Sequence, residues 1–158
     1  MKGNLPYFYI KENLENTRGI RIYTLENIPS NTDTLNERFY EIPRELVLEI
    51  EKTKNFIFPD LMMNVYPLIS ERFREVLLLF DIEIFVKRVV LIDKESREMQ
   101  SYYLLYTKNL LNTDFNNFFK AVREENKKIR FIVNLDFAES LIRRDVKGIE
   151  FVEVEESV

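Results

Sequence analysis

The sequence contains no cysteine, no histidine and only three glycines among its 158 residues. Without cysteine the chain can form no disulfide, no thiolate nucleophile and no zinc–thiolate site. Three glycines are too few for glycine-rich phosphate loops and dinucleotide-binding fingerprints, which need several close backbone approaches. Without histidine, acid–base catalysis would have to use Asp, Glu, Lys or Tyr side chains with shifted pKa values. The absences therefore remove the commonest catalytic and metal-binding constellations, and we expect no cofactor and no metal.

Long apolar runs are missing too. The first ten residues, MKGNLPYFYI, lack the apolar stretch of a signal peptide, and no run approaches the ~20 residues of a membrane span. The net charge of −4 and the pI near 5.1 argue against general binding of polyanions. We expect a cytoplasmic protein with no membrane and no nucleic acid among its partners.

The composition is that of a chain that folds. Apolar residues make up 46% of it and charged residues 32%, with 13 Phe and 8 Tyr, which is too hydrophobic for intrinsic disorder. A chain of this length buries roughly 68–70% of the surface that it exposes when unfolded. We expect a single domain over residues 1–158, of class α+β, with a mainly antiparallel sheet and two or three short helices.

The first third of the chain has the pattern of short strands and loops. β-branched and aromatic residues predict strands over residues 7–10, 19–25, 38–42 and 46–50. Polar clusters between them, such as NIPSNTDT, predict loops. Residues 31–42 also offer oxygen ligands, but Asn36 and Ile42 stand where a calcium loop needs Gly and Glu. We therefore expect no bound ion there, and an extended segment over 55–61 with Pro59 outside any central strand.

A capped helix follows residue 70. Pro67 holds the preceding residue away from helical geometry, Ser70 is the expected N-cap, and Glu71 places a negative charge in the first turn. Apolar residues then recur at i, i+3, i+4 and i+7, which predicts a buried helix face made of Phe73, Val76, Leu77 and Phe80. The motif Pro67, Ser70, Glu71 and Phe73 is thus expected to be structural.

The rest of the chain alternates between strand and helix patterns. Residues 82–107 predict an antiparallel hairpin, 113–122 a helix presenting Phe115, Phe118, Phe119 and Val122, and 127–135 a strand. A capping box at Asp136 and Glu139 then predicts a helix that buries Phe137, Leu141 and Ile142, before a last strand over 149–154. Residues 69–89 and 135–154 thereby form two similar helix–strand units, each helix expected to pack on the strand that it precedes.

Motifs for chemistry fail on their details. KGIEFVEV, residues 147–154, resembles an RNA-recognition signature, but Ile149 and Val154 replace two aromatics and Glu150 stands where a small residue belongs. We expect a plain core strand there. The carboxylates of Glu49 and Glu51, which share a strand face, favour a solvated surface over a catalytic pair. No catalytic residues are predicted.

Three tyrosines near residue 104 are candidates for partner binding. Alternation along a strand sends Tyr102 and Tyr106 to one face and Tyr103 to the other. Tyrosine is large and amphipathic, and it is frequent in the hot spots of protein interfaces. The alternative is that all three pad the edge of the core with their hydroxyls in water.

With these elements placed, residues 55–154 resemble a bacterial immunity-protein family from polymorphic toxin systems. The resemblance rests on Pro67, Leu68, Ser70 and Glu71 before the helix, the strand Lys87-Arg88-Val89-Val90, the segment Tyr102-Tyr103-Leu104, and the second unit at 136–154. Residues 1–54 are similar only in length and in their strand-and-loop character.

The resemblance implies a small, non-enzymatic cytoplasmic protein that binds and neutralises a cognate toxin domain, and mild acidity is compatible with a basic partner. Two alternatives remain from the sequence. One is a small hydrolase or transferase using carboxylate and Tyr residues, and the other is a regulatory binding subunit unrelated to toxins.

Overall fold

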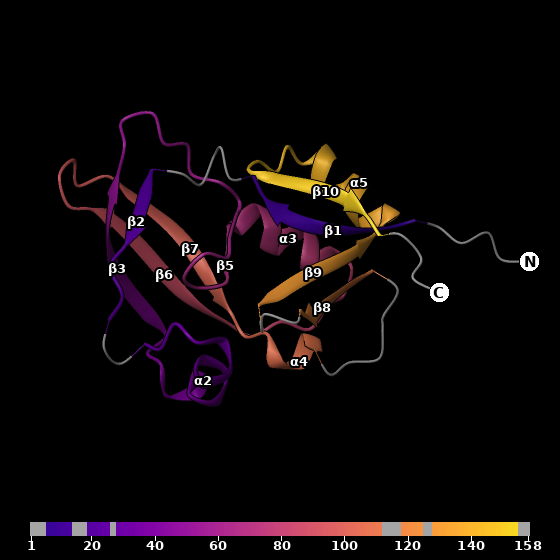
Figure 1. Cartoon of the computed structure of the whole chain (residues 1–158), viewed down its shortest axis with the longest axis horizontal. Helices are drawn as coiled ribbons and strands as arrows, with labels where there is room; N and C mark the ends of the chain where they lie inside the picture. The colour runs from indigo at the N-terminus through magenta and orange to yellow at the C-terminus, as the bar shows by residue number, and fades with distance from the viewer. Residues whose placement is uncertain (1–5, 14–18, 26–27, 112–117, 125–127, 155–158) are drawn as a thin grey trace, which may run out of the picture.

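The strands lie in two mostly antiparallel sheets accompanied by short helices (Figure 1). This computed structural model describes residues 6–13, 19–25, 28–111, 118–124 and 128–154. The architecture is the mixed α+β class that the sequence predicts. The strands divide between a six-stranded and a four-stranded sheet, a division that local sequence patterns do not reveal.

The six-stranded sheet has the order β2-β3-β6-β7-β5-β4. Its strands are β2 (Ile20–Ile22), β3 (Glu45–Lys52), β4 (Leu61–Met62), β5 (Leu68–Ile69), β6 (Val86–Asp93) and β7 (Met99–Leu105). β3 and β6 run parallel and all other neighbours antiparallel. β6 and β7 form the predicted hairpin, whose turn is closed by Asp93. Its carboxylate accepts 2.8 Å hydrogen bonds from both the amide and the hydroxyl of Ser96.

The four-stranded sheet has the order β10-β1-β9-β8 and is antiparallel throughout. It consists of β1 (Tyr7–Glu12), β8 (Phe119–Arg123), β9 (Ile129–Asn134) and β10 (Ile149–Glu153). β8 corrects the prediction of a helix over 113–122. Phe119 and Ala121 are both buried two positions apart, so the strand period replaces the helical one. Phe115, the first residue of the predicted helix face, lies outside the described residues.

Helix α3 (Glu71–Leu79) forms as predicted. The Ser70 hydroxyl accepts a 3.1 Å hydrogen bond from the Phe73 amide, and Glu71 lies in the first turn. Pro67, immediately before β5, is buried, and its carbonyl accepts a 2.9 Å hydrogen bond from the Leu105 amide. Phe73, Val76 and Leu77 are fully buried, and Phe80, the C-cap, is partly buried against the same core, so the predicted helix face is confirmed with Phe80 at its edge.

Helix α5 (Leu135–Arg143) is also present, although its cap differs from the predicted one. The Asn134 side chain accepts a 2.9 Å hydrogen bond from the Phe137 amide, so the N-cap is Asn134 and Asp136 lies in the first turn. Phe137 and Leu141 are fully buried as expected. Ile142 is 62% exposed, so its predicted place in the core is wrong.

Residues 31–42 contain a short helix that the sequence analysis missed, α2 (Thr32–Glu37), and a 3₁₀ turn, η1 (Phe39–Glu41). The predicted strand over 38–42 is therefore wrong. Asn31 caps α2 by accepting hydrogen bonds from the amides of Asp33 and Thr34. Leu35 and Phe39, four residues apart, are buried together, so helical spacing prevails over the β-propensity of the aromatic residues.

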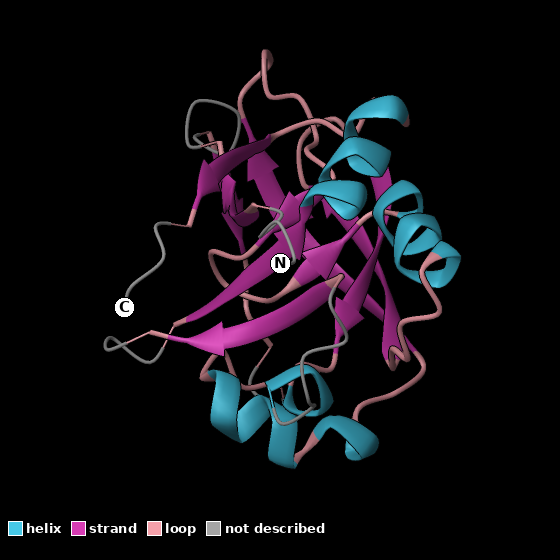
Figure 2. Cartoon of the chain, turned by 90° about the vertical axis from the view of Figure 1, so that its right-hand side faces the viewer, coloured by secondary structure: helices cyan, strands magenta, loops and turns pink. Residues whose placement is uncertain are grey.

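The two similar helix–strand units lie in different sheets. Helix α3 precedes β6 of the larger sheet, whereas α5 precedes β10 of the smaller one. The two helices pack on one another, and α3 packs to a similar extent on β7 and α5 on β9 and β1. The expectation that each helix packs chiefly on the strand that it precedes is therefore wrong. Figure 2 shows the helices gathered in two groups, α3 and α5 forming one of them and α2 lying in the other with η1 and α4 (Lys108–Leu111).

The loop before β4 joins the two sheets through Asp60. Its carboxylate accepts hydrogen bonds from the Ser70 hydroxyl at 2.5 Å and from the Lys147 amide at 2.6 Å. The Asp60 backbone adds two more, donating to the Lys147 carbonyl and accepting from the Ser70 amide, each at 2.9 Å. Since Ser70 caps α3 and Lys147 leads into β10, Asp60 fixes the larger sheet against the smaller one.

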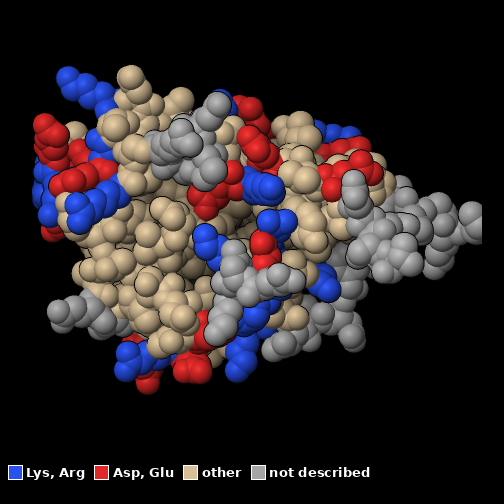
Figure 3. Space-filling view, in the orientation of Figure 1, with Lys and Arg blue, Asp and Glu red and all other residues tan. Residues whose placement is uncertain are grey.

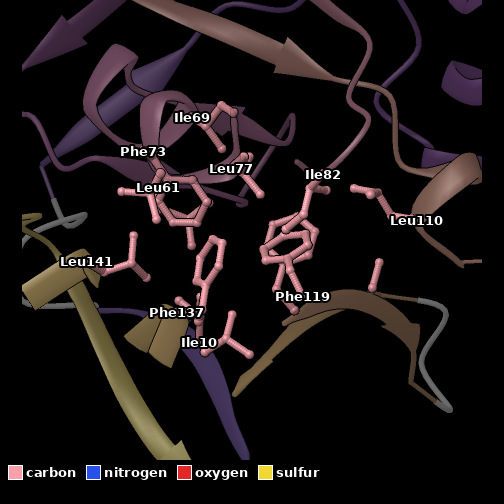
Figure 4. Close-up of a cluster of buried hydrophobic side chains, with 14 of the residues drawn as sticks. Ile10, Leu61, Ile69, Phe73, Leu77, Ile82, Leu110, Phe119, Phe137 and Leu141 are labelled. Carbon is pink, nitrogen blue, oxygen red and sulfur yellow. The ribbon is translucent and has the colours of Figure 1, made fainter. Parts of the chain in front are cut away.

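Two clusters of buried side chains fill the molecule. The first brings together Phe73 of α3, Phe119 of β8 and Phe137 of α5, with ring centroids 5.2–6.4 Å apart (Figure 4). The second lies on one face of the larger sheet, where Leu48, Leu91 and Tyr102 pack beneath α2 and η1. The opposite face of the β3–β6–β7 region carries exposed residues instead of the first core. The larger sheet therefore lies between the two cores over only part of its area.

Candidate protein-binding site

The three predicted tyrosines occupy different environments. Tyr102 is 1% exposed, and its hydroxyl donates a 2.5 Å hydrogen bond to the Pro59 carbonyl. Burial, together with the nearby charge of Asp60, raises the pKa of Tyr102 far above its ordinary value. A side chain in this position cannot touch a partner, so Tyr102 belongs to the core and not to a binding surface.

Tyr103 faces the opposite side of the sheet, as the alternation predicts. It is half-buried at the edge of the first core, with the Arg74 guanidinium 4.9 Å from its ring centroid. A hydrogen bond with Glu71 is the main cause of a raised pKa for the Tyr103 hydroxyl. Because its ring and its hydroxyl both have partners on α3, Tyr103 contributes to helix docking.

Tyr106 lies in a group of four aromatic residues, which we call the aromatic corner: Phe39, Tyr40, Phe85 and Tyr106. The Tyr106 ring lies 4.9 Å from Phe39, 5.7 Å from Tyr40 and 6.2 Å from Phe85, measured between centroids. Phe39 is buried, whereas Tyr40 is 68% and Phe85 37% exposed. The corner thus has a buried base and an aromatic surface open to solvent.

Three segments position the aromatic corner. Phe39 and Tyr40 belong to η1, Phe85 immediately precedes β6, and Tyr106 immediately follows β7. A 2.9 Å hydrogen bond from the Tyr106 amide to the Phe85 carbonyl extends the β6–β7 pairing by one step. The Phe85 and Tyr106 rings therefore stand at the end of the β6–β7 hairpin, where backbone pairing limits their movement.

A buried polar pair holds η1 and α2 against this hairpin end. The Asn36 side-chain amide donates to the Thr107 hydroxyl at 3.0 Å, and its oxygen accepts from the Thr107 amide at 3.3 Å. Asn36 is 6% and Thr107 0% exposed. Buried polar groups with satisfied hydrogen bonds define one arrangement of the elements that they join, because breaking them costs desolvation energy. Asn36 and Thr107 thereby fix Tyr40 relative to Tyr106.

Charges around the corner are mixed in sign. The Lys87 ammonium lies 5.2 Å from the Phe39 ring centroid, and Arg38 pairs with Glu41 at 3.8 Å. Figure 3 shows a broad area without charged residues on the face turned to the viewer, bordered by lysine and arginine together with aspartate and glutamate. An uncharged aromatic patch with a mixed rim is the usual composition of a protein–protein interface.

Sequence reasoning found one of the two tyrosines on this surface. Tyr106 is among the predicted binding residues, but Tyr40 and Phe85 are not. The predicted strand over 38–42 gives no reason to expect an exposed Tyr40. Phe85 lies in a continuous run of strand-forming residues, which likewise gives no sign that its ring is exposed. The spacing of Leu35 and Phe39 after Asn31 was the available signal for α2, and a 3₁₀ turn after it would have turned Tyr40 outward.

The Asp93 carboxyl group, whose pKa is shifted, serves a structural role. The hydrogen bonds from the Ser96 amide and hydroxyl hold the pKa of Asp93 below its ordinary value, although the side chain is buried. Asp93 borders an open depression of about 550 Å³ that is also lined by Glu51 and Lys52. Both oxygens of the Asp93 carboxylate accept hydrogen bonds, from Ser96 and from the Lys52 amide, and these bonds favour the ionised form. A general acid must carry a proton to donate, so Asp93 does not suit that role. Within the described ranges, no group of three or more acidic residues is arranged to hold a metal ion.

Comparisons with known proteins were made for the whole chain. Neither a scan against protein-family models nor a search of curated proteins returned a match. In the part of the chain that the structure describes, no helix combines the length and the apolar character needed to cross a bilayer.

Proposed function

We propose that this chain is a non-enzymatic immunity protein that binds a cognate bacterial toxin domain through the aromatic corner. The observation that carries the proposal is the exposed Tyr40 ring, which lies 5.7 Å from the Tyr106 ring at an interplanar angle of 53°, in a segment held by the buried Asn36–Thr107 hydrogen bonds. An aromatic side chain that is 68% exposed gains the most from being covered by a partner.

The rigidity of the aromatic corner also favours binding. Ordering a mobile side chain on binding costs about 0.5–1.5 kcal/mol, and a preorganised surface avoids this cost. Tyr40 and Tyr106 are each held by a neighbouring ring, and Tyr106 is also held by the backbone hydrogen bond to Phe85. Rigid tyrosines of this kind are the usual hot spots of a protein interface.

The class of partner comes from the sequence resemblance. Two segments that carry it, Lys87 to Val90 and Tyr102 to Leu104, lie in β6 and β7. Phe85 precedes the first of them and Tyr106 follows the second. The aromatic corner therefore adjoins two of the segments that carry the resemblance, which supports it as the toxin-binding surface.

Co-expression tests this proposal. The toxin would be the carboxy-terminal domain of the large protein encoded beside this chain. Cells producing that domain together with the wild-type chain should survive, and the two proteins should co-purify in a fixed ratio. Cell death without a complex would refute the pairing. Survival without a complex would refute neutralisation by direct binding and would favour a catalytic mechanism.

A further inference from the structure

Among the described residues, no helix or strand covers one face of the larger sheet at its β2–β3–β6–β7 region. We call this region the open sheet face and define it by the outward residues Tyr23, Glu45, Val47, Glu49, Arg88, Val90, Ile92 and Met99. Val47 is 59% and Met99 64% exposed, and Val90 and Ile92 are half-buried. The opposite face of the same strands carries the second core.

The apolar residues here break the usual alternation. A sheet with one face in water normally carries polar residues on that face. β3 follows this rule at Glu45 and Glu49, but Val47 lies between them and is directly paired with Val90. Ile92 is directly paired with Met99 on the other side of β6. Val47, Val90, Ile92 and Met99 therefore form a contiguous patch, and charged residues border it at Glu45 and Arg88 and at Glu49, which is paired with Ile92 and lies 3.4 Å from Lys94.

The parallel pairing of β3 and β6 makes this patch complementary to itself. Their register sets Glu45 opposite Arg88 and Val47 opposite Val90. Suppose that a second copy is stacked face to face, with a two-fold axis parallel to the strands and midway between β3 and β6. The axis exchanges the two strands without reversing them, so Glu45 of each copy lies over Arg88 of the other. Val47 likewise lies over Val90.

The flanking strands extend the match. The Tyr23 amide donates to the Glu49 carbonyl, and Glu49 is level with Ile92 and Met99. The same axis exchanges β2 with β7, so Met99 of one copy lies over Tyr23 of the other. A depression of about 440 Å³ is open at this level, lined by Tyr23, Val47 and Ile92 and also by the charged residues Glu49, Lys94 and Arg97. Methionine is flexible and packs well against apolar and aromatic side chains, so Met99 suits the side of the depression formed by Val47 and Ile92.

We infer that the open sheet face binds a second copy of this chain, as a two-fold symmetric dimer of stacked sheets. An isologous interface requires one patch to be its own complement, and the β3–β6 register supplies that property at two levels, Glu45 with Arg88 and Val47 with Val90. Stacked sheets pack about 10 Å apart at roughly −30°, so the match is closest near the axis. The inference goes beyond the proposed function and does not depend on it.

Dimerisation leaves the aromatic corner free. Lys87 and Val89 point to the corner side of β6, whereas Arg88 and Val90 point to the open sheet face. A failure of one proposal therefore does not imply a failure of the other. A dimer would present two toxin-binding surfaces.

Sedimentation velocity at about 1 to 200 µM protein gives the first test. The wild-type chain should shift from monomer to dimer over this range. Val47→Lys should raise the dissociation constant about 30-fold or more, because it places an ammonium group in the apolar centre. Ile142→Lys, at an apolar position on α5 that is 62% exposed, is the matched control and should dimerise like the wild type. A wild-type monomer throughout, or a Val47→Lys dimer of unchanged affinity, would overturn the inference.

Charge exchange between copies tests the symmetry itself. The Glu45 and Arg88 side chains lie 3.4 Å apart within one chain and are exposed. E45R alone and R88E alone each place like charges across the two-fold axis, so each should be monomeric. An equimolar mixture of E45R and R88E pairs opposite charges at both positions and should form a heterodimer. A mixture that stays monomeric while both variants keep the wild-type circular dichroism spectrum would contradict the proposed axis.

Discussion

The Ser70 hydroxyl donates a 2.5 Å hydrogen bond to the Asp60 carboxylate while it accepts one of 3.1 Å from the Phe73 amide. One hydroxyl group therefore caps α3 and also holds the loop that joins the two sheets. The sequence predicts the cap alone, because the partner on Asp60 comes from the tertiary structure. The second bond changes what a substitution at this position should cost.

Ser70→Ala should lower the free energy of unfolding by about 2 kcal/mol, with about 1 kcal/mol from the lost cap and a similar amount from the Asp60 carboxylate left short of a donor. Urea denaturation measures the difference. Ser101→Ala, at an exposed serine of β7 whose hydroxyl accepts a long, 3.5 Å hydrogen bond from the exposed Arg88, is the control and should change stability by less than about 0.5 kcal/mol. A loss no larger than that of the control would show that neither bond stabilises the protein.

Phe73→Ala should cost about 3–5 kcal/mol, because it leaves a cavity among Phe119 and Phe137 in the first core. Leu79→Ala removes a side chain of the same helix that is 59% exposed, and it should cost less than about 1 kcal/mol. Equal effects of the two substitutions would contradict the assigned buried face of α3. Thermal or urea unfolding of both variants gives the comparison.

Gly148→Ala should destabilise more than Gly19→Ala. A Cβ at residue 148 would lie 2.2 Å from the Pro59 Cβ, in a backbone with φ of +78° that side-chain-bearing residues rarely adopt. A Cβ at residue 19 would meet the Thr53 side chain at 2.7 Å, which can rotate away. We expect a loss of about 3 kcal/mol or more at residue 148 and about 1–2 kcal/mol at residue 19. The reverse order in urea denaturation would be incompatible with the close packing of β10 on Pro59.

Glu12→Gln should stabilise the protein at neutral pH. Burial raises the pKa of the Glu12 carboxyl, outweighing the hydrogen bond from the Met63 amide and the charge of Lys128. A carboxyl with a raised pKa favours folding while protonated, and this contribution is lost as pH rises through the folded-state pKa. Glutamine keeps an acceptor oxygen without the charge.

The unfolding free energy of Glu12→Gln should therefore exceed that of the wild type at pH 7, and the difference should shrink as the pH falls toward 4. Glu150→Gln, on the exposed side of β10, serves as the control for removing one carboxylate and should change the unfolding free energy at pH 7 by less than about 0.5 kcal/mol. A Glu12→Gln variant that is less stable than the wild type at pH 7 would show that ionised Glu12 stabilises the fold.

Local patterns predicted those elements whose signals are contained within a few residues. Helix α3 combines a cap at Ser70 with an apolar stripe beginning at Phe73, and the β6–β7 hairpin has a polar turn between two apolar runs. The sequence pattern does not predict helix α2, because Asn36 and the aromatic residues after it are weak helix formers. It predicts a helix where the structure has β8, because the spacing of Phe118, Phe119 and Val122 fits a period of 3.6 as well as a run of strand residues.

The division into two sheets depends on contacts between distant residues. β1 inserts between β10 and β9, so Ile10 is paired with both Phe151 and Phe131. No periodicity in the sequence encodes such a pairing. The same holds for the candidate site. Tyr106 could be predicted as a binding residue from the alternation along its strand. The position of Tyr40 depends on the Asn36–Thr107 hydrogen bonds, which join residues 71 positions apart in the sequence.

The most direct test of the proposed function is a calorimetric titration of the toxin domain encoded beside this chain with the wild type and three tyrosine variants. Tyr40→Ala and Tyr106→Ala should each weaken binding by about 2 kcal/mol or more, roughly 30-fold in Kd, because they remove rings of the aromatic corner. Tyr103→Ala, whose ring packs on Arg74 of α3, should bind within about threefold of the wild type. Unchanged affinity of Tyr40→Ala and Tyr106→Ala, in folded protein, would contradict the assignment of the aromatic corner as the toxin-binding surface.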